Sequence, residues 1–303
     1  MTSATATALA RAGLAGHPSD GYGGATLSVT LRNFAAEVQV APAPRLDIAP
    51  ADGGQWPEGG QPLVAATLAR FARHCAQHDT AFDDRLRIRY RSAIPREVGL
   101  GGSSAIVIAT LRALCTLTGV TIERERLPAL ALAVETEELG IAAGLQDRVA
   151  QTYEGLVFMD LARAAYEPLD ATLLPALFVA WLPAAGTASG GAHADVRERF
   201  EHNDREVTTA MRTLATLAHD ARAALLRADH DAFAAALDAG YDVRASVFAL
   251  DPRHAALVGR ARALGLGATY TGSGGAIVGI ATDGDKVAAL ARQDAARVEM
   301  ARI

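Results

Sequence analysis

The sequence predicts an α+β protein of two lobes, divided near residue 160. Strand-like alternation occurs in both halves of the 303-residue chain, helix-like stretches lie between the strands, and half of the residues are apolar. A chain of this length and apolar content can bury the cores of two compact lobes. We therefore expect an N-terminal domain over residues 1–160 and a C-terminal domain over residues 161–303.

The first half of the chain alternates strand and helix patterns. Leu86, Ile88 and Tyr90 alternate with four arginines, which predicts a strand with one solvated face rather than a binding stripe. The predicted elements are a strand or hairpin over residues 25–40, a loop over 41–62, a helix over 63–75, a strand over 85–91 and a helix up to about residue 117.

The second half begins with a helix and ends with a glycine-rich turn between two strands. Within residues 203–250, apolar residues such as Val207, Met211, Leu214, Leu217 and Ala221 recur at helical spacing, which predicts a packed pair of helices. The predicted elements are a helix over residues 126–140, strands over 155–161 and 176–182, the helix pair, a strand–turn–strand unit over 265–282 and a helix from Asp285.

Charge and composition exclude several classes of function. The formal net charge of −5 includes no basic block, so no nucleic-acid partner is expected. No stretch of about 18 apolar residues lacks a charge, so no membrane span is expected, and the N-terminus has no signal-peptide pattern. Cys75 and Cys115 do not stand at metal-ligand spacing, which favours a reducing, cytoplasmic setting. His74 and His78 lack a third ligand, so a histidine-based metalloenzyme is not expected.

Residues 95–105 (PREVGLGGSSA) form a glycine-rich loop between a predicted strand and a predicted helix. The first N–H groups of a helix have no intrahelical partner and lie at the positive end of its dipole, so an anion fits there. The loop has no lysine, which excludes a Walker A motif, and Ser104 stands where a dinucleotide fingerprint needs Gly or Ala. By itself, the loop predicts either a bound anion or a structural helix cap.

Residues 10–24 and 270–278 accompany this loop in the order typical of the GHMP kinase superfamily of small-molecule kinases. The residues that resemble the family's central and C-terminal motifs are Pro95, Gly99, Leu100, Gly101, Gly102, Ser103, Ser104 and Ala105, then Gly272, Ser273, Gly274, Gly275 and Ala276. The resemblance implies an N-terminal lobe with a mixed sheet and the phosphate loop, and a ferredoxin-like C-terminal lobe. It also implies that ATP and Mg²⁺ are required.

The first motif resembles that of the sugar kinases in this superfamily. Arg11 and Asp20 match the sugar-kinase pattern, whereas His17 and Pro18 replace its Glu-His pair, which disfavours galactose. The segments most similar to plant-type glucuronokinases are GHPSDGYGG (16–24), AGLQDRVAQ (143–151), FMD (158–160) and SGGAHADVRERF (189–200). The plant pattern has Asn at the position of His17. This resemblance implies ATP-dependent phosphorylation of D-glucuronate at its anomeric hydroxyl.

Two carboxylates in residues 134–160 match family positions. Glu135 shares a predicted helix face with Leu132 and Leu139, so it points partly inward and needs a cation, unless it is a solvated member of a glutamate-rich run. Glu138, one turn further along, is the alternative metal ligand. Asp147 matches a family aspartate, although it could instead cap the following helix.

The resemblance implies a role for each matching residue. Asp147 would orient or deprotonate the sugar hydroxyl, Arg11 would pair with Asp147, and Ser104 with Glu135 would hold Mg²⁺. The residues expected to bind ATP are Gly99, Leu100, Gly101, Gly102, Ser103, Ser104, Ala105 and Trp56, and an ordinary packed tryptophan is the alternative for Trp56. The residues expected to bind the sugar are His17, Ser19, Asp20, Tyr22, Arg148, Gly274 and Gly275. The candidates for binding a substrate carboxylate are His17, Ser19, Tyr22, Arg148, Ser189 and Arg197, although Arg197 could be a solvated helix residue.

Three other functions fit the same motifs. The chain could be a kinase for another substrate (galacturonate, a heptose, fucose, galactose or a mevalonate-type alcohol), a non-catalytic sugar and ATP sensor, or a nucleotide-dependent decarboxylase. The presence of Arg11, Ser104, Glu135 and Asp147 disfavours a sensor. We expect a small-molecule sugar or sugar acid as partner and a monomer or homodimer in solution.

Overall fold

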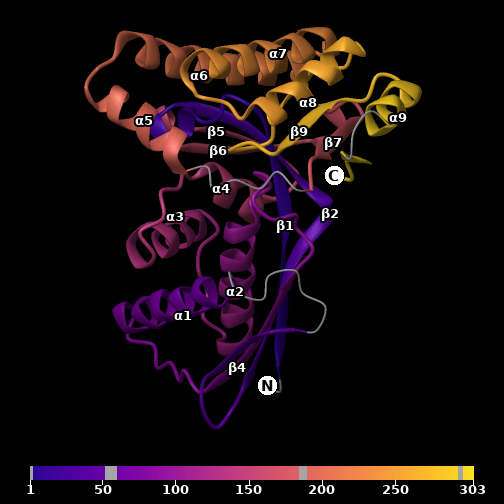
Figure 1. The fold of residues 1–303 in the computed structure, drawn as a ribbon. Coiled ribbons are helices and arrows are strands. Elements are labelled where there is room, and N and C mark those ends of the chain that lie inside the picture. The colour runs from indigo at the N-terminus through magenta and orange to yellow at the C-terminus, as the bar shows by residue number, and fades with distance from the viewer. Residues whose placement is uncertain (1–2, 52–59, 184–189, 293–295) are drawn as a thin grey trace. The chain divides into compact units, whose positions relative to one another are not determined.

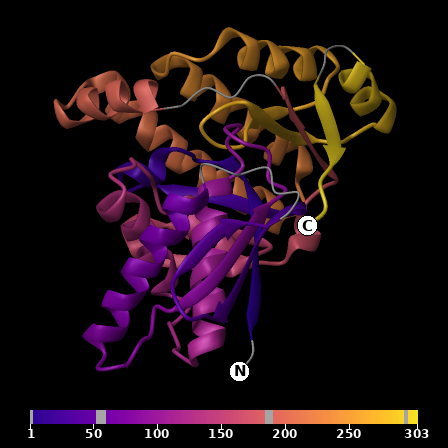
Figure 2. The same ribbon diagram turned by 60° about the horizontal axis from the view of Figure 1, so that its bottom comes forward.

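The structure is a computed structural model that describes residues 3–51, 60–183, 190–292 and 296–303. The chain forms two compact units, and neither is continuous in sequence. Unit 1 contains Met1–Ala10, Arg32–Arg96 and Gly101–Tyr153, and unit 2 contains Arg11–Leu31, Glu97–Leu100 and Glu154–Ile303. Strands β1 (Ala4–Ala15) and β2 (Ala25–Pro42) each contribute residues to both units. Figures 1 and 2 show the course of the chain through these elements.

Unit 1 is built around helix α2, which packs against three other helices and strand β4 (Figure 1). From Ala105 to Leu111 every residue of α2 is buried, as expected for a central helix. Its helices are α1 (Gly60–Gln77), α2 (Gly102–Thr118), α3 (Leu127–Ala133), the π-helical turn η2 (Val134–Glu138) and α4 (Gln146–Tyr153), and its shorter strands are β3 (Asp47–Pro50) and β4 (Leu86–Ser92).

Strand β4 confirms the alternation seen in the sequence. Leu86, Ile88 and Tyr90 are buried, whereas Arg87 and Arg91 are exposed. The strand pairs antiparallel with residues 36–42 of β2 and parallel with β3. The arginines therefore form the solvated face of a sheet, and Arg91 pairs with Glu37 across the strands.

Unit 2 contains a four-stranded antiparallel sheet in the order β10-β7-β9-β8. In chain order, a helical segment separates β7 from β8, and α9 separates β9 from β10, so the ferredoxin-like arrangement implied by the resemblance is confirmed. Its elements are β7 (Leu177–Trp181), α5 (Gly190–Glu201), α6 (Arg205–Leu226), α7 (His230–Val247), α8 (Pro252–Ala263), β8 (Ala268–Tyr270), β9 (Ala276–Ile280), α9 (Gly284–Arg292) and β10 (Arg297–Met300).

The core of unit 2 lies between this sheet and its helices. All residues of the central strands β7 and β9 are buried, and α7 and α8 pack against β8. Helices α6 and α7 form the expected packed pair, shown in orange in Figure 1. Each begins with an aspartate cap: Asp204 accepts bonds from two N–H groups of α6, and Asp229 accepts one from α7. A second antiparallel group joins residues 25–29 of β2 to β5 (Leu156–Asp160) and β6 (Ala165–Leu169).

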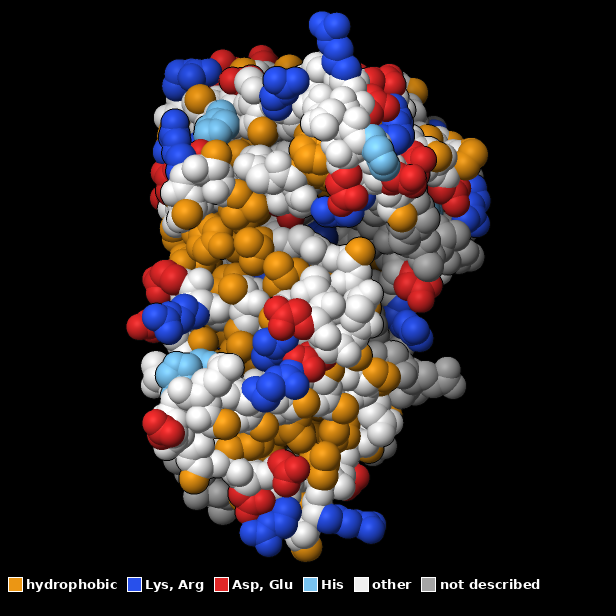
Figure 3. Space-filling view, turned by 90° about the vertical axis from the view of Figure 1, so that its left-hand side faces the viewer, with side chains coloured by type: hydrophobic (Ala, Val, Ile, Leu, Met, Phe, Trp, Pro, Cys, Tyr) orange, Lys and Arg blue, Asp and Glu red, His pale blue; other side chains and the backbone are white. Residues whose placement is uncertain are grey.

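Several elements differ from the sequence predictions. Strand β1 was not predicted, because its Ala-rich sequence has little strand propensity, and it is stabilised by pairing with β2. The loop expected over residues 41–62 is wrong at β3, where four residues pair with β4. None of the helices in the described ranges combines the length and the hydropathy required of a transmembrane span. Basic and acidic side chains are interspersed on the face drawn in Figure 3 rather than separated by sign.

Candidate active site

The glycine-rich loop enters α2 through a left-handed turn. Gly101 has φ 71° at the N-cap, a conformation that residues with a Cβ rarely adopt. Its carbonyl accepts hydrogen bonds from the Ser104 hydroxyl at 3.0 Å and from the Gln151 side-chain amide at 2.7 Å. These bonds hold the carbonyl side of the turn, while the first N–H groups of α2 keep no intrahelical partner. This end of α2 is therefore suited to bind an anion.

Gln151 of α4 is a site residue that the sequence analysis did not identify. Its side chain is fully buried, and its amide nitrogen also donates to the Leu9 carbonyl at 3.1 Å. Gln151 thereby connects β1 to the start of α2 through Gly101. Its presence in the AGLQDRVAQ segment was the available signal, but only the fold shows which backbone atoms it reaches.

Glu135 and Arg148 form a buried ion pair in unit 1. Glu135 lies in the π-helical turn η2 and is 1% exposed, and Arg148 of α4 is 3% exposed. The Arg148 guanidinium donates to Glu135 through Nη2 and to the Gly144 carbonyl through Nη1 at 2.8 Å. The expectation that Glu135 points inward is confirmed, and its carboxylate meets the guanidinium group of Arg148 from the same unit. π-Helical turns inside helices occur frequently at functional sites.

Asp147 is the more accessible carboxylate of this group. Its side chain is 20% exposed, and its Oδ2 lies 3.8 Å from Nη1 of Arg148. Because α4 begins at Gln146, Asp147 lies within the first turn, and the alternative role as helix cap is wrong. Asp147 and Glu135 therefore lie near the same guanidinium group, one partly accessible and the other buried.

Glu138 points to a different part of unit 1 from Glu135. Its carboxylate lies 2.8 Å from Nη2 of Arg70 and also contacts Arg73, both from α1. Arg70 also bonds Glu137. The two candidate metal ligands thus have separate surroundings, because Glu138 connects η2 to α1 while Glu135 meets α4.

In unit 2, the two glycine-rich segments lie backbone against backbone. Residues 97–100 contact the turn 271–275, and the Ala276 N–H donates to the Val98 carbonyl at 2.9 Å. Such an approach leaves no space for side chains at the points of contact. Gly99, Gly272 and Gly275 therefore have a structural cause within unit 2, independent of any bound phosphate.

The geometry shows which glycines the contact requires. A Cβ atom at Gly99 would lie 3.0 Å from the Gly274 carbonyl oxygen, and one at Gly272 would lie 2.6 Å from the Gly99 oxygen. A Cβ at Gly275, where φ is +92°, would lie 2.7 Å from Cα of Val98. These distances are shorter than ordinary van der Waals contact, so a substitution at any of the three would displace backbone.

Arg11 connects the same two segments through its side chain. Its Nη1 donates to the carbonyls of Gly99 at 2.7 Å and Thr271 at 2.6 Å. Its backbone N–H donates to Leu100 at 3.1 Å, and the residue is 5% exposed. The structure thus shows Arg11 as the buried cation that holds the loop and the C-terminal turn together.

The first motif forms a tight turn that contains the 3₁₀-helix η1 (Ser19–Tyr22). The Ser19 side chain is fully buried and donates to the Ala25 carbonyl at 2.9 Å, so its hydroxyl stabilises the turn. His17 and Asp20 are also buried. Four residues expected to bind sugar therefore come from one compact turn: His17, Ser19, Asp20 and Tyr22.

Tyr22 lies between this turn and helix α5. Its ring packs against Phe200 with centroids 4.7 Å apart, and the Arg197 guanidinium lies 5.2 Å from its centroid. Burial raises the pKa of the Tyr22 phenol, while the charge of Arg197 acts in the opposite direction. Arg197 also donates to the Gly21 carbonyl at 3.3 Å, so it contacts the turn although it is exposed. Trp56 and Ser189 lie outside the described residues.

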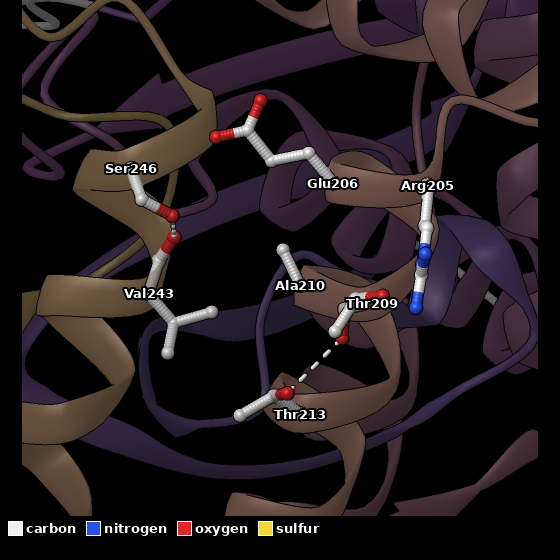
Figure 4. A pocket seen from close by; sticks show the side chains of 7 residues that line it. All are labelled: Arg205, Glu206, Thr209, Ala210, Thr213, Val243 and Ser246. Atoms are coloured by element: carbon white, nitrogen blue, oxygen red, sulfur yellow. Dashed lines mark hydrogen bonds between the residues drawn. The ribbon is translucent and has the colours of Figure 1, made fainter.

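A surface pocket between α6 and α7 is separate from all of these residues (Figure 4). Its lining residues are Arg205, Glu206, Thr209, Ala210, Thr213, Val243 and Ser246. The hydroxyls of Thr213 and Ser246 donate to carbonyls of their own helices, at 3.0 and 2.8 Å. The pocket contains none of the candidate site residues, and two of its hydroxyls, those of Thr213 and Ser246, are used within their own helices.

Comparison with known proteins identifies the family. Residues 63–155 match the GHMP kinases N terminal domain, and residues 221–296 match the GHMP kinases C terminal domain. Glucuronokinase 1 of Arabidopsis thaliana is 34% identical over 91% of this chain and 84% of its own length. Probable glucuronokinase 2 of the same organism is 35% identical over 91% of this chain and 83% of its own.

Solved structures give the same result for the fold. The galactokinase of Lactococcus lactis, solved with galactose, superposes with a TM-score of 0.81 over 99% of this chain and 93% of its own, at 14% identity. At that identity the likeness concerns the fold alone. The ferredoxin-like sheet and the glycine-rich turn at the start of α2 agree with the family models that match both parts of the chain. With the similarity to two glucuronokinases over 91% of the chain, they show that the chain belongs to the GHMP kinase family.

Proposed function

We propose that this GHMP kinase transfers the γ-phosphoryl group of ATP to the anomeric hydroxyl of D-glucuronate, giving glucuronate 1-phosphate. The observation that carries the proposal is the 34% identity to Glucuronokinase 1 over 91% of the chain. The sugar-kinase form of the first motif supports it. We also propose that the functional domains divide near residue 160, as the sequence predicts.

The start of α2 would bind the phosphates of ATP. Its free N–H groups and positive dipole end suit oxyanions, and the Gly101 turn allows the phosphates to approach the backbone. The residues assigned to the nucleotide are Gly99, Leu100, Gly101, Gly102, Ser103, Ser104, Ala105 and Trp56. Among them, Ser104 is fully buried and donates to Gly101, so binding a cation would require its hydroxyl oxygen to act as an acceptor at the same time.

Ser104 and Glu135 fit a magnesium site in their chemistry. Both supply oxygen donors, which Mg²⁺ prefers, and Mg²⁺ needs few protein ligands because it keeps several waters. Glu135 is the better candidate than Glu138, because Glu138 is engaged by two arginines of α1. Arg148 already meets one Glu135 oxygen and would orient the carboxylate. Mg²⁺ bound there would neutralise charge on the phosphate oxygens.

Asp147 would accept the proton of the sugar hydroxyl. Its carboxylate is partly accessible, as required of a group that must reach a substrate. It lies in the first turn of a helix in which Gln146 and residues 148–152 are buried. Arg11, held by two carbonyls of unit 2, would supply positive charge for the transferred phosphoryl group. Gly274 and Gly275, with the residues of the first motif, would complete the sugar site in unit 2.

The proposal is tested by ADP release with Mg-ATP against glucuronate, galacturonate, glucose, galactose, fucose, a heptose and mevalonate. We expect turnover with glucuronate and a product that is stable to mild alkali but labile to acid, as a sugar 1-phosphate is. Turnover only with another member of the panel would replace the substrate while keeping the kinase. ATP binding without turnover on any of them would contradict the proposal and favour a sensor.

A further inference from the structure

Arg244 of α7 is a buried cation that the sequence analysis did not identify. It is 2% exposed, and its guanidinium carbon lies 5.2 Å from the ring centroid of Phe248 and 5.4 Å from that of Tyr270. Its Nε is buried without an acceptor. Within the described ranges of the chain, no carboxylate forms an ion pair with its side chain and no acceptor hydrogen bonds to it.

The two aromatic rings compensate this charge only in part. Their faces attract a cation, but they offer no oxygen atoms to the five N–H donors of a guanidinium group. Burying a charge without hydrogen-bonding partners is costly, so a buried arginine normally meets a carboxylate or a phosphate. Arg244 therefore lacks the anion that usually accompanies a buried guanidinium.

The surroundings of Arg244 belong to the candidate sugar site of unit 2. Tyr270 directly precedes the turn 271–275, and a Cβ atom at Gly274 would lie 4.0 Å from the Tyr270 ring. Burial lowers the pKa of Arg244 to about 10, and the charge of Arg11 acts in the same direction, whereas Tyr270 and Asp20 act in the opposite one. The group is thus a cation at neutral pH, within electrostatic reach of two residues of the first motif.

The other arginines considered for a substrate carboxylate are already engaged. Arg148 donates to Glu135, and Arg197 is exposed and donates to the Gly21 carbonyl. A carboxylate has two coplanar oxygens that accept two parallel hydrogen bonds from a guanidinium group. This bidentate geometry makes the interaction both strong and selective. Arg244 combines burial, a retained charge and donors that no described residue uses.

We propose that Arg244 binds the carboxylate group of the sugar-acid substrate and thereby selects uronates over neutral sugars. This assignment rests on the proposed function, because it presumes a sugar acid in unit 2. The Tyr270 and Phe248 rings would keep the guanidinium in place when no substrate is bound. Asp20, on the turn of the first motif, would meet sugar hydroxyls rather than the carboxylate.

The test compares D-glucuronate with D-glucuronamide, its neutral isostere, by calorimetric binding and by steady-state kinetics on the full chain. The Arg244→Gln variant should bind glucuronate about 100-fold more weakly, bind glucuronamide within about threefold of the wild type and keep the KM for ATP. The Arg244→Lys variant, which keeps the charge but not the fork, should lose about tenfold. The Arg244→Lys variant also serves as the test if Arg244→Gln does not fold.

Arg262→Gln is the matched control. Its guanidinium also lies over a tyrosine ring, 4.9 Å from Tyr241, but it is paired with Asp238 and Asp242. Glucuronate binding should not change in this variant. If folded Arg244 variants still discriminate between glucuronate and glucuronamide as the wild type does, the role of Arg244 is overturned. The proposed function is not affected by that result. A wild type that binds and phosphorylates neither sugar would contradict the proposed function and, with it, this assignment.

Discussion

Arg148 and Arg244 are almost equally buried, with 3% and 2% of their surfaces exposed, but their charges are compensated differently. In unit 1, Arg148 donates to the buried carboxylate of Glu135 and lies 3.8 Å from Asp147. In unit 2, Arg244 faces two aromatic rings, and the structure describes no ion pair for it. A charge that the fold itself neutralises contributes to the scaffold, whereas a charge left without an anion is available to a ligand.

Arg11 is a third buried arginine, and its side chain contacts backbone carbonyls. It is 5% exposed and donates to the carbonyls of Gly99 and Thr271. Its guanidinium group therefore holds two loop segments of unit 2 together.

The largest expected effect is on kcat, and it tests the proposed catalytic role of Asp147, which lies near Arg148. Asp147→Asn should lower kcat roughly 10³-fold with little change in ATP binding, because the variant cannot accept the hydroxyl proton. Steady-state kinetics measures this, with Asp231→Asn, an exposed residue in the first turn of α7, as control. A raised KM for glucuronate with unchanged kcat would instead assign Asp147 to binding.

The second prediction tests the comparison directly through stability. Arg148→Met should lower the free energy of unfolding by about 3–5 kcal/mol, because it leaves Glu135 buried without its partner. Arg244→Met should change it by less than about 1 kcal/mol, because it strands no opposite charge. Urea unfolding without substrate measures both variants. Equal losses in the two variants would mean that both arginines are structural.

The third prediction concerns the backbone contact between residues 97–100 and the turn 271–275, the two segments that Arg11 connects. Gly275→Ala should cost about 2–4 kcal/mol, because the new Cβ would lie 2.7 Å from Val98 Cα in addition to the left-handed strain. The control is Gly140→Ala, where φ is also positive but nothing lies within 4 Å. It should cost about 1 kcal/mol, the conformational strain alone. Thermal unfolding of the two variants would show no difference if the segments can separate freely.

The smallest expected effect concerns the pKa of a buried acid, the Cys115 thiol, in place of a buried base such as Arg244. Burial raises the pKa of the Cys115 thiol from 9.0 to about 11, just as it lowers the pKa of Arg244, because the neutral form is favoured in both cases. The folded state keeps this proton longer than the unfolded chain, so its contribution to stability is lost as pH rises between about 9 and 11.

Alkylation by iodoacetamide at mildly alkaline pH measures the thiolate directly. The native protein should react far more slowly than the unfolded one, because few thiolates are present. Cys115→Ser identifies the share of Cys75, whose pKa burial also raises. Rapid alkylation of native Cys115 would contradict the burial argument.

The sequence predicted most helices and the central strands because their patterns are local. The alternation in β4 and the helical spacing in α1, α2, α6 and α7 follow from which side chains must avoid water. Strand β1 has no such pattern, since its alanines and threonines become a strand only when β2 provides hydrogen-bond partners. Strand β3 was missed for the same reason.

For the candidate site, motif spacing located the loop, the carboxylates and the turn along the chain. It did not predict that Arg148 would meet Glu135, that Gln151 would hold Gly101, or that Glu138 would bond to α1. These contacts join residues distant in sequence or depend on how a helix is rotated, which a motif does not encode. Arg244 has no motif, and only its burial distinguishes it from an ordinary helix arginine.

By itself, the sequence determined the class of the protein, the order of its motifs and the chemical types of the site residues, because these depend on residue identity and local spacing. The tertiary structure decided which charges are paired. A guanidinium group has the same chemistry at residues 148 and 244, and only the packing around it decides whether a carboxylate of the chain or an aromatic face is its neighbour. Burial makes that difference matter, since water no longer screens the charge.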